Sequence, residues 1–244
     1  MIGNLTPRDR LITALDVPTT SEARRLVNDL GDSVSIYKVG LELLFAGGLD
    51  IVAELRHIRK RVFLDVKLLD IGNTVERAIA TIAELGVTFV TVHGTDLKTM
   101  RAAVAGRGSG PLRLLAVTVL TNLNADDLRE QGVGTRLEEL SLQRACLAQE
   151  AGFDGVIASG HEASKIRQAV GPDFLIVTPG IRLPGGTTDD QERVMTPDRA
   201  IEAGADYIVV GRPITKGDDP RAVAETFTNH IRAAYTRLAH GPKS

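Results

Sequence analysis

The sequence lacks the features that mark secreted and membrane proteins. A single cysteine, Cys146, occurs among 244 residues, so no disulfide can form within the chain and a reducing compartment suits it. Cys146 falls in a helical stretch, 138–150, where we expect a buried and inert thiol. No apolar run reaches the roughly 18 residues that span a bilayer, and the N-terminus has no signal-peptide core. We therefore expect a soluble, cytoplasmic protein.

The chain also has little excess charge of either sign. It carries 29 Lys and Arg against 31 Asp and Glu, a formal net charge of −2. No global field then attracts nucleic acid or an anionic membrane, and we expect neither as a partner. An anionic ligand must instead be bound by a local cluster of cations. The five histidines show no paired ligand spacing, so we expect no metal site.

Short apolar runs alternate with amphipathic helical stretches along the whole chain. The expected strands are Leu11–Val17, Ser35–Leu41, Val62–Leu68, Phe89–His93, Leu112–Leu120, Gly155–Ser159, Phe174–Thr178 and Tyr207–Val210. Near-continuous apolar strands, each followed by a helix, indicate a parallel sheet covered by helices. Eight repeats in about 250 residues are typical of a (β/α)₈ TIM barrel, an α/β fold. We expect residues 1–244 to form one such domain.

A doubly wound open sheet is the structural alternative. It would usually have fewer strands and a glycine-rich turn after the first one. The sequence instead has Leu15-Asp16-Val17-Pro18 at that point, which favours the barrel.

The segment after the seventh expected strand, residues 182–196, is longer and more polar than a tight turn requires. It contains glycines beside small polar residues, a composition typical of mobile loops with exposed backbone N–H groups. Active sites of barrels lie at the C-terminal ends of the strands. We therefore expect a lid that grips phosphate, the alternative being an ordinary surface insertion.

Four acidic and basic residues, Asp16, Lys38, Asp65 and Lys67, fall at the ends of the first three expected strands. Residues two apart in a strand share a face, so Asp65 and Lys67 should emerge side by side. Because a buried charge is costly unless an opposite charge accompanies it, such a cluster can hold a lysine protonated near a negative substrate. A strand-end salt bridge would explain any one of them, but four at one barrel mouth indicate an active site.

A second group of residues follows the later strands. Thr121 comes after the fifth, Arg182 after the seventh, and Gly211 and Arg212 after the eighth. In barrels, the loops after strands seven and eight commonly form a phosphate site. A guanidinium offers a planar fork for phosphate oxygens, and Gln191 of the long loop can close on the same group.

The segment Asp65-Val66-Lys67-Leu68-Leu69-Asp70-Ile71-Gly72-Asn73-Thr74 resembles the D-x-K-x-x-D-I-x-N-T signature of the orotidine 5′-phosphate decarboxylase family. The resemblance extends, in order, through 15–16, 37–40, 116–121, 178–182 and 210–213, with no departure at a motif position. It implies cofactor-independent decarboxylation of orotidine 5′-phosphate to uridine 5′-phosphate (UMP), a step of de novo pyrimidine biosynthesis.

The resemblance also implies catalytic roles for Lys67, Asp65, Asp70 and Lys38. Lys67 would protonate C6 of the pyrimidine after carbon dioxide leaves, and Asp65 would lie against the departing carboxylate. Lys38 and Asp16 would bind the ribose hydroxyls and keep Lys67 charged and oriented.

Further residues would bind substrate from other loops and from a second subunit. Thr121 would lie near the pyrimidine. The phosphate would be held by Arg182, Gln191, Gly211 and Arg212. In a homodimer, the neighbouring site would receive Asp70, Ile71 and Thr74.

Two other functions remain open at this point. Hexulose-phosphate synthases share the D-x-K-x-x-D core but use Mg²⁺ and sugar phosphates. The continuation of the signature through Thr74 and the segment 178–182 favour the decarboxylase. A non-catalytic nucleotide-binding barrel is the other alternative, although such a protein has no need of Lys67.

Overall fold

Eight parallel strands close into a barrel in the order β1 to β8 in the computed structural model, which describes residues 5–185 and 193–240. The strands are β1 (Leu11–Ala14), β2 (Ile36–Gly40), β3 (Arg61–Leu68), β4 (Phe89–His93), β5 (Arg113–Val117), β6 (Gly155–Ile157), β7 (Leu175–Thr178) and β8 (Tyr207–Val210). Pairing of β1 with β8 completes the ring. The predicted barrel is thus confirmed, and the open sheet is excluded.

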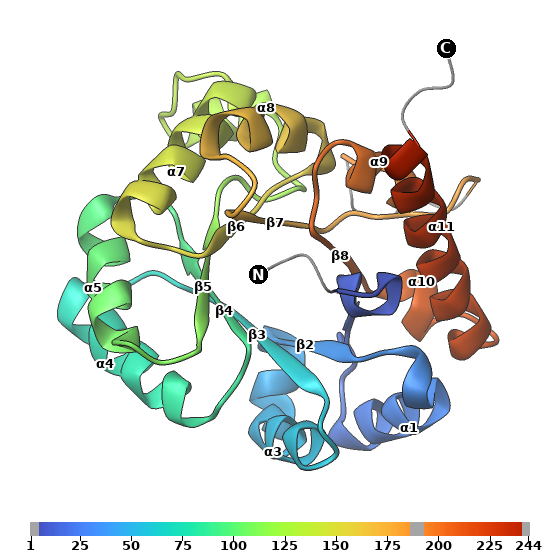
Figure 1. The fold of residues 1–244 in the computed structure, drawn as a ribbon. Helices are drawn as coiled ribbons and strands as arrows, with labels where there is room; N and C mark the ends of the chain where they lie inside the picture. Colours follow the sequence, from blue (N-terminus) through green and yellow to red (C-terminus); the bar gives the residue numbers. More distant parts are fainter. Residues whose placement is uncertain (1–4, 186–192, 241–244) are drawn as a thin grey trace.

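Helices form a ring outside the strands (Figure 1). They are α1 (Thr20–Leu30), α2 (Leu41–Leu43), α3 (Leu49–His57), α4 (Gly72–Glu84), α5 (Leu97–Arg107), α6 (Ala125–Glu130), α7 (Leu137–Ala151), α8 (Gly160–Val170), α9 (Pro197–Glu202), α10 (Arg212–Thr215) and α11 (Pro220–His240). Three short helical turns supplement them: η1 (Pro7–Arg10), η2 (Gly31–Ser33) and η3 (Leu44–Gly48). Within the described ranges, no helix is both long and apolar enough to cross a membrane.

The prediction that Cys146 is buried was wrong, because its side chain is exposed on α7. The buried face of this helix is formed by Leu140, Ser141, Ala145, Ala148 and Ala151. Cys146 is the next residue after Ala145, about 100° further around the helix, and therefore faces outward.

The interior of the barrel is filled by apolar side chains from alternating strand positions. Three rings pack edge to face there: Phe63 against Phe89, and Phe89 against Tyr207. A second, larger core lies between the strands and the helices. The next inward-facing positions of β2, β3 and β4, two residues after Ile36, Phe63 and Phe89, hold the polar residues Lys38, Asp65 and Thr91.

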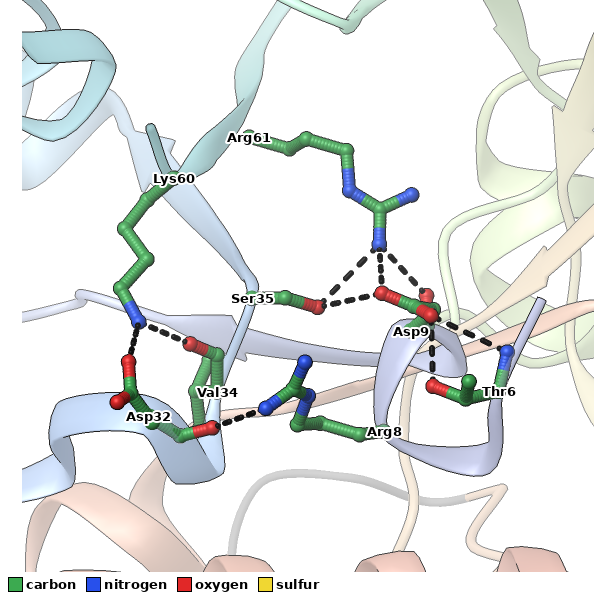
Figure 2. Close-up of polar contacts among 8 residues, drawn as sticks. All are labelled: Thr6, Arg8, Asp9, Asp32, Val34, Ser35, Lys60 and Arg61. Atoms are coloured by element: carbon green, nitrogen blue, oxygen red, sulfur yellow. Dashed lines mark hydrogen bonds and ion pairs between the residues drawn. The ribbon is translucent and has the colours of Figure 1, made fainter. Parts of the chain in front are cut away.

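A network of polar contacts ties the N-terminal ends of the strands together (Figure 2). Asp9 of η1 accepts from Arg61 at the start of β3 (2.6 Å) and from Ser35 just before β2 (3.0 Å). Lys60 donates to the carbonyl of Val34 (2.8 Å), and Arg8 reaches the carbonyl of Asp32. These contacts fasten the base of the barrel, which is the end associated with stability rather than with catalysis.

Strand β3 is irregular where it meets β4. Leu64 pairs with Val90 and Leu68 with Val92, so three residues of β3, 65–67, lie opposite the single residue Thr91. Lys67 has a φ of 47°, a left-handed conformation that is uncommon outside glycine. This bulge is one of the devices that re-aim side chains next to active sites.

Candidate active site

The four charged residues predicted to cluster do lie together, at the C-terminal end of the barrel. Lys38 Nζ is 2.8 Å from Asp16 Oδ1 and 3.5 Å from Asp65 Oδ2, and Lys67 Nζ is 2.8 Å from Asp65 Oδ2. The charges therefore alternate in the order Asp16, Lys38, Asp65, Lys67. Lys38 and Asp65 are each only 8% exposed, so the middle of the array is shielded from water.

Electrostatics keep the buried members of the array ionised. Burial by itself would lower the pKa of Lys38, but Asp65 and Asp16 more than compensate and raise it above its ordinary value. Burial would likewise raise the pKa of Asp65, yet Lys38 and Lys67, with the hydroxyl of Thr91, hold it below its ordinary value. Each buried charge is thus maintained by its neighbours, as the sequence indicated.

The chain must come very close to itself to bring Asp16 and Lys38 into contact. A Cβ at Gly40 would lie 2.8 Å from Lys38 Nζ and 2.9 Å from Asp16 Oδ1. Any side chain there would displace the ion pair, which explains glycine at the last position of β2. Asp16 itself lies in the loop beyond β1, because that strand ends at Ala14 rather than at Val17.

The explanation given for Asp65 and Lys67 needs correction, although their proximity was predicted. In a regular strand, alternation would place both side chains on one face. Here the bulge and the left-handed backbone of Lys67 break the alternation. The two side chains nevertheless meet, since Lys67 Nζ donates to Asp65 Oδ2 at 2.8 Å.

An inner cavity of about 250 Å³ opens onto the array. All four residues of the array form its charged wall, and most of the remaining lining is apolar, including Val117 and Ile157. Thr121 lies at the rim, in the loop after β5, since that strand ends at Val117 rather than at Leu120. A mostly apolar pocket with a few convergent charges suits a flat organic ring.

An outer cleft of about 600 Å³ adjoins the cavity and shares several wall residues with it. Arg182, Gly211, Arg212 and Lys216 line this cleft. Arg182 lies in the loop after β7 and is 8% exposed, Gly211 lies between β8 and α10, and Arg212 is the first residue of α10. The three cations that lie outside the array, Arg182, Arg212 and Lys216, can bind a dianion such as a phosphate group.

The structure places Asp70, Ile71 and Thr74 differently from the other predicted residues. All three are exposed, and none of them lines either hollow. Ile71 is 72% exposed, which is unusual for a large apolar side chain. Gln191 lies outside the described residues.

Two kinds of residue in the site were missed by sequence reasoning. Lys216 and Glu42 line the outer cleft, and nothing in their local sequence distinguishes them from surface residues. Thr91 is fully buried and contacts both Lys67 and Asp65. The sequence could have indicated Thr91, because it lies two residues after Phe89 and is therefore an inward-facing polar residue on an apolar strand.

Another hollow, of about 570 Å³, lies on the outside of the barrel between α1 and α3. Its charged residues Arg24 and Glu54 are exposed and paired with each other at 2.8 Å. Size alone therefore does not identify the site; the shielded charge array does.

Comparison with known proteins agrees with the geometry. The family model described as "Orotidine 5'-phosphate decarboxylase / HUMPS family" matches residues 9–227. This match includes every residue of the charge array and of the cationic cleft.

Individual relatives match over nearly their full length. An orotidine 5′-phosphate decarboxylase of Methylobacterium nodulans is 54% identical over 231 residues, which cover 93% of this chain and 98% of the relative. One from Bradyrhizobium diazoefficiens is 49% identical over 232 residues, covering 95% and 98%. The crystal structure of orotidine 5′-phosphate decarboxylase from Lactobacillus acidophilus superposes with a TM-score of 0.79 at 38% identity, covering 91% of this chain and 98% of that one. The chain belongs to the orotidine 5′-phosphate decarboxylase / HUMPS family.

Proposed function

We propose that this protein decarboxylates orotidine 5′-phosphate to UMP without a cofactor, with Lys67 protonating C6, as one catalytic domain in pyrimidine biosynthesis. The observation that carries the proposal is the Asp16–Lys38–Asp65–Lys67 array, buried at Lys38 and Asp65, beside a cationic cleft. That arrangement suits a pyrimidine ring at one end of a ligand and a phosphate at the other. Relatives named as this decarboxylase are about half identical to the chain and support the assignment.

The chemistry requires a positive charge at one point of the ring. When the bond from C6 to the carboxylate breaks, carbon dioxide leaves and the electron pair stays on C6 in the plane of the ring. The π system does not delocalise that pair well, so the protein must stabilise it electrostatically. The Lys67 ammonium supplies the charge and then transfers its proton to C6.

Asp65 contributes to the same step from the other side of the reacting bond. A substrate carboxylate placed beside Asp65 meets a like charge, and this repulsion is relieved when neutral carbon dioxide forms. Lys38 and Asp16 would hold the ribose hydroxyls, since both line the inner cavity and the outer cleft. The Lys38 ammonium also separates the two carboxylates of the array.

The proposed phosphate site is separate from the position of the reacting carbon. We assign it to Arg182, Gly211 and Arg212, because these residues line the outer cleft. Thr121 would lie near the pyrimidine, because it also lines the inner cavity. Binding energy from a remote phosphate can be expressed as rate. Closure of Gln191 and the loop at 182–196 over the phosphate stays a prediction, because residues 186–192 lie outside the described part of the chain.

A homodimer with shared sites forms the second half of the proposal. Asp70, Ile71 and Thr74 follow β3 at the mouth of the barrel but line neither hollow of their own chain. Large exposed apolar residues follow the adjacent strands β2 and β3 at this edge: Leu41, Phe45, Leu69 and Ile71. Exposed apolar side chains gathered at one edge suit a subunit interface, through which Asp70 would enter the neighbouring site.

The first prediction concerns Lys67. We expect Lys67→Ala to lower kcat by roughly 10²–10⁴-fold, the usual contribution of a positioned acid, with the fold retained. The assay follows loss of the orotate ultraviolet absorbance in EDTA, and Lys165→Ala, an exposed lysine of α8, is the control.

Three results would contradict this part of the proposal. A Lys67→Ala variant that keeps most of its kcat removes Lys67 as the proton donor. Wild-type protein that leaves orotidine 5′-phosphate unchanged, but consumes sugar phosphates once Mg²⁺ is added, is a hexulose-phosphate synthase. Nucleotide binding without turnover of either substrate indicates a binding protein.

The second prediction concerns Arg212. We expect Arg212→Ala to raise the KM for orotidine 5′-phosphate by about 10- to 100-fold, because a charge-assisted hydrogen bond to phosphate is lost. Turnover of orotidine, which has no phosphate, should not change. Arg25→Ala on the surface of α1 is the control, and equal losses on both substrates would refute the assignment.

The third prediction concerns the shared site. Lys67→Ala and Asp70→Ala proteins should each be nearly inactive, but mixing them should restore up to about a quarter of wild-type activity. Random exchange makes half of the dimers hybrid, and each hybrid has one intact site of two. If Asp70 acted within its own subunit, no activity would return; a sedimentation mass equal to one 26.1 kDa chain would also contradict the proposal.

A further inference from the structure

Thr91 on β4 contacts both principal residues of the array although it is fully buried, at 0% exposure. The backbone N–H of Lys67 donates to Thr91 Oγ1 at 2.9 Å, and that hydroxyl donates to Asp65 Oδ1 at 2.9 Å. One side chain thus links the carboxylate of Asp65 to the backbone of Lys67.

The bulge in β3 explains why Lys67 needs such a partner. Residues 65–67 share one opposing residue, Thr91, so the Lys67 N–H bonds to a side chain where a regular ladder would supply a backbone carbonyl. The backbone there is also left-handed, with φ at 47°. Such conformations persist at functional sites only where surrounding contacts fix them.

A hydroxyl can satisfy both neighbours at once. An ionised carboxylate only accepts hydrogen bonds and a backbone N–H only donates them, whereas a hydroxyl does both. Valine has nearly the shape of threonine and can do neither. Serine retains the hydroxyl and lacks only the methyl group.

We propose that Thr91 is a positioning residue for the reaction, whose hydroxyl fixes the Asp65 carboxylate and the Lys67 backbone as one unit. The inference rests on the roles proposed above for Asp65 and Lys67. Because Thr91 is fully buried, it touches no ligand in the cavity and acts only through these two residues. The Asp65 Oδ2 atom remains for Lys67 and Lys38 while Oδ1 is held by Thr91.

The test compares Thr91→Val with Thr91→Ser and with Thr13→Val. Thr13 of β1 is an equally buried barrel threonine whose hydroxyl has no hydrogen-bond partner among the described residues. We expect Thr91→Val to lower kcat for orotidine 5′-phosphate about 10- to 100-fold, the effect of a small misplacement of reacting groups. The Kd for UMP should change little, and both Thr91→Ser and Thr13→Val should keep near-wild-type kcat.

A double-mutant cycle separates positioning from general destabilisation. If Thr91 acts through Asp65, adding Thr91→Val to Asp65→Asn should lower kcat much less than it does in wild type. If the kcat losses of Thr91→Val and Asp65→Asn instead multiply in the double variant, Thr91 has a merely structural role. If Thr91→Val fails to bind UMP, Thr91→Cys, with a weak donor, replaces it and should fall between serine and valine.

The inference is overturned if Thr91→Val matches Thr13→Val in kcat, or if Thr91→Ser is as impaired as Thr91→Val. Failure of the proposed function has a different outcome. In that case the wild-type protein would leave orotidine 5′-phosphate unchanged, or Lys67→Ala would keep most of its kcat, whatever the Thr91 variants do.

Discussion

The site depends on one carboxylate, Asp65, held out of water between two lysines. An isolated charge in that position would be neutralised, because burial disfavours ionisation. Lys38 and Lys67 keep Asp65 charged, and Asp65 with Asp16 keeps Lys38 charged. Removing any one of them alters the balance of the others. Gly40 and the β3 bulge are the structural conditions for this arrangement, since they permit the close approach and direct the side chains.

The two ends of the barrel use charged residues for different purposes, stability at one end and ligand binding at the other. At the N-terminal ends of the strands, ion pairs such as that of Asp9 with Arg61 stabilise the fold (Figure 2). At the C-terminal ends, the charges line hollows where a ligand can meet them. Ring packing of Phe63, Phe89 and Tyr207 fills the space between the two ends. A rigid interior below the array limits how far its members can move apart.

The architecture and the clustering of the four charged residues could be predicted from the sequence, for physical reasons. Buried parallel strands are apolar throughout, so all eight were recognisable, and charges at their ends stood out. Asp65 and Lys67 were paired correctly although the alternation argument fails at the bulge, which depends on register with β4. Thr91 was missed because threonine is common in strands. Cys146 was misplaced because one residue decides which side of a helix is buried.

The central claim is that Asp65 keeps the buried Lys38 ammonium charged. It is tested most directly by NMR titration of lysines labelled at Cε, with Lys38 assigned from a Lys38→Arg variant. The account predicts a pKa for Lys38 above its usual 10.5 in the wild type. In Asp65→Asn that pKa should fall, because burial is then opposed only by Asp16. A Lys38 pKa that is unchanged by Asp65→Asn would contradict the account.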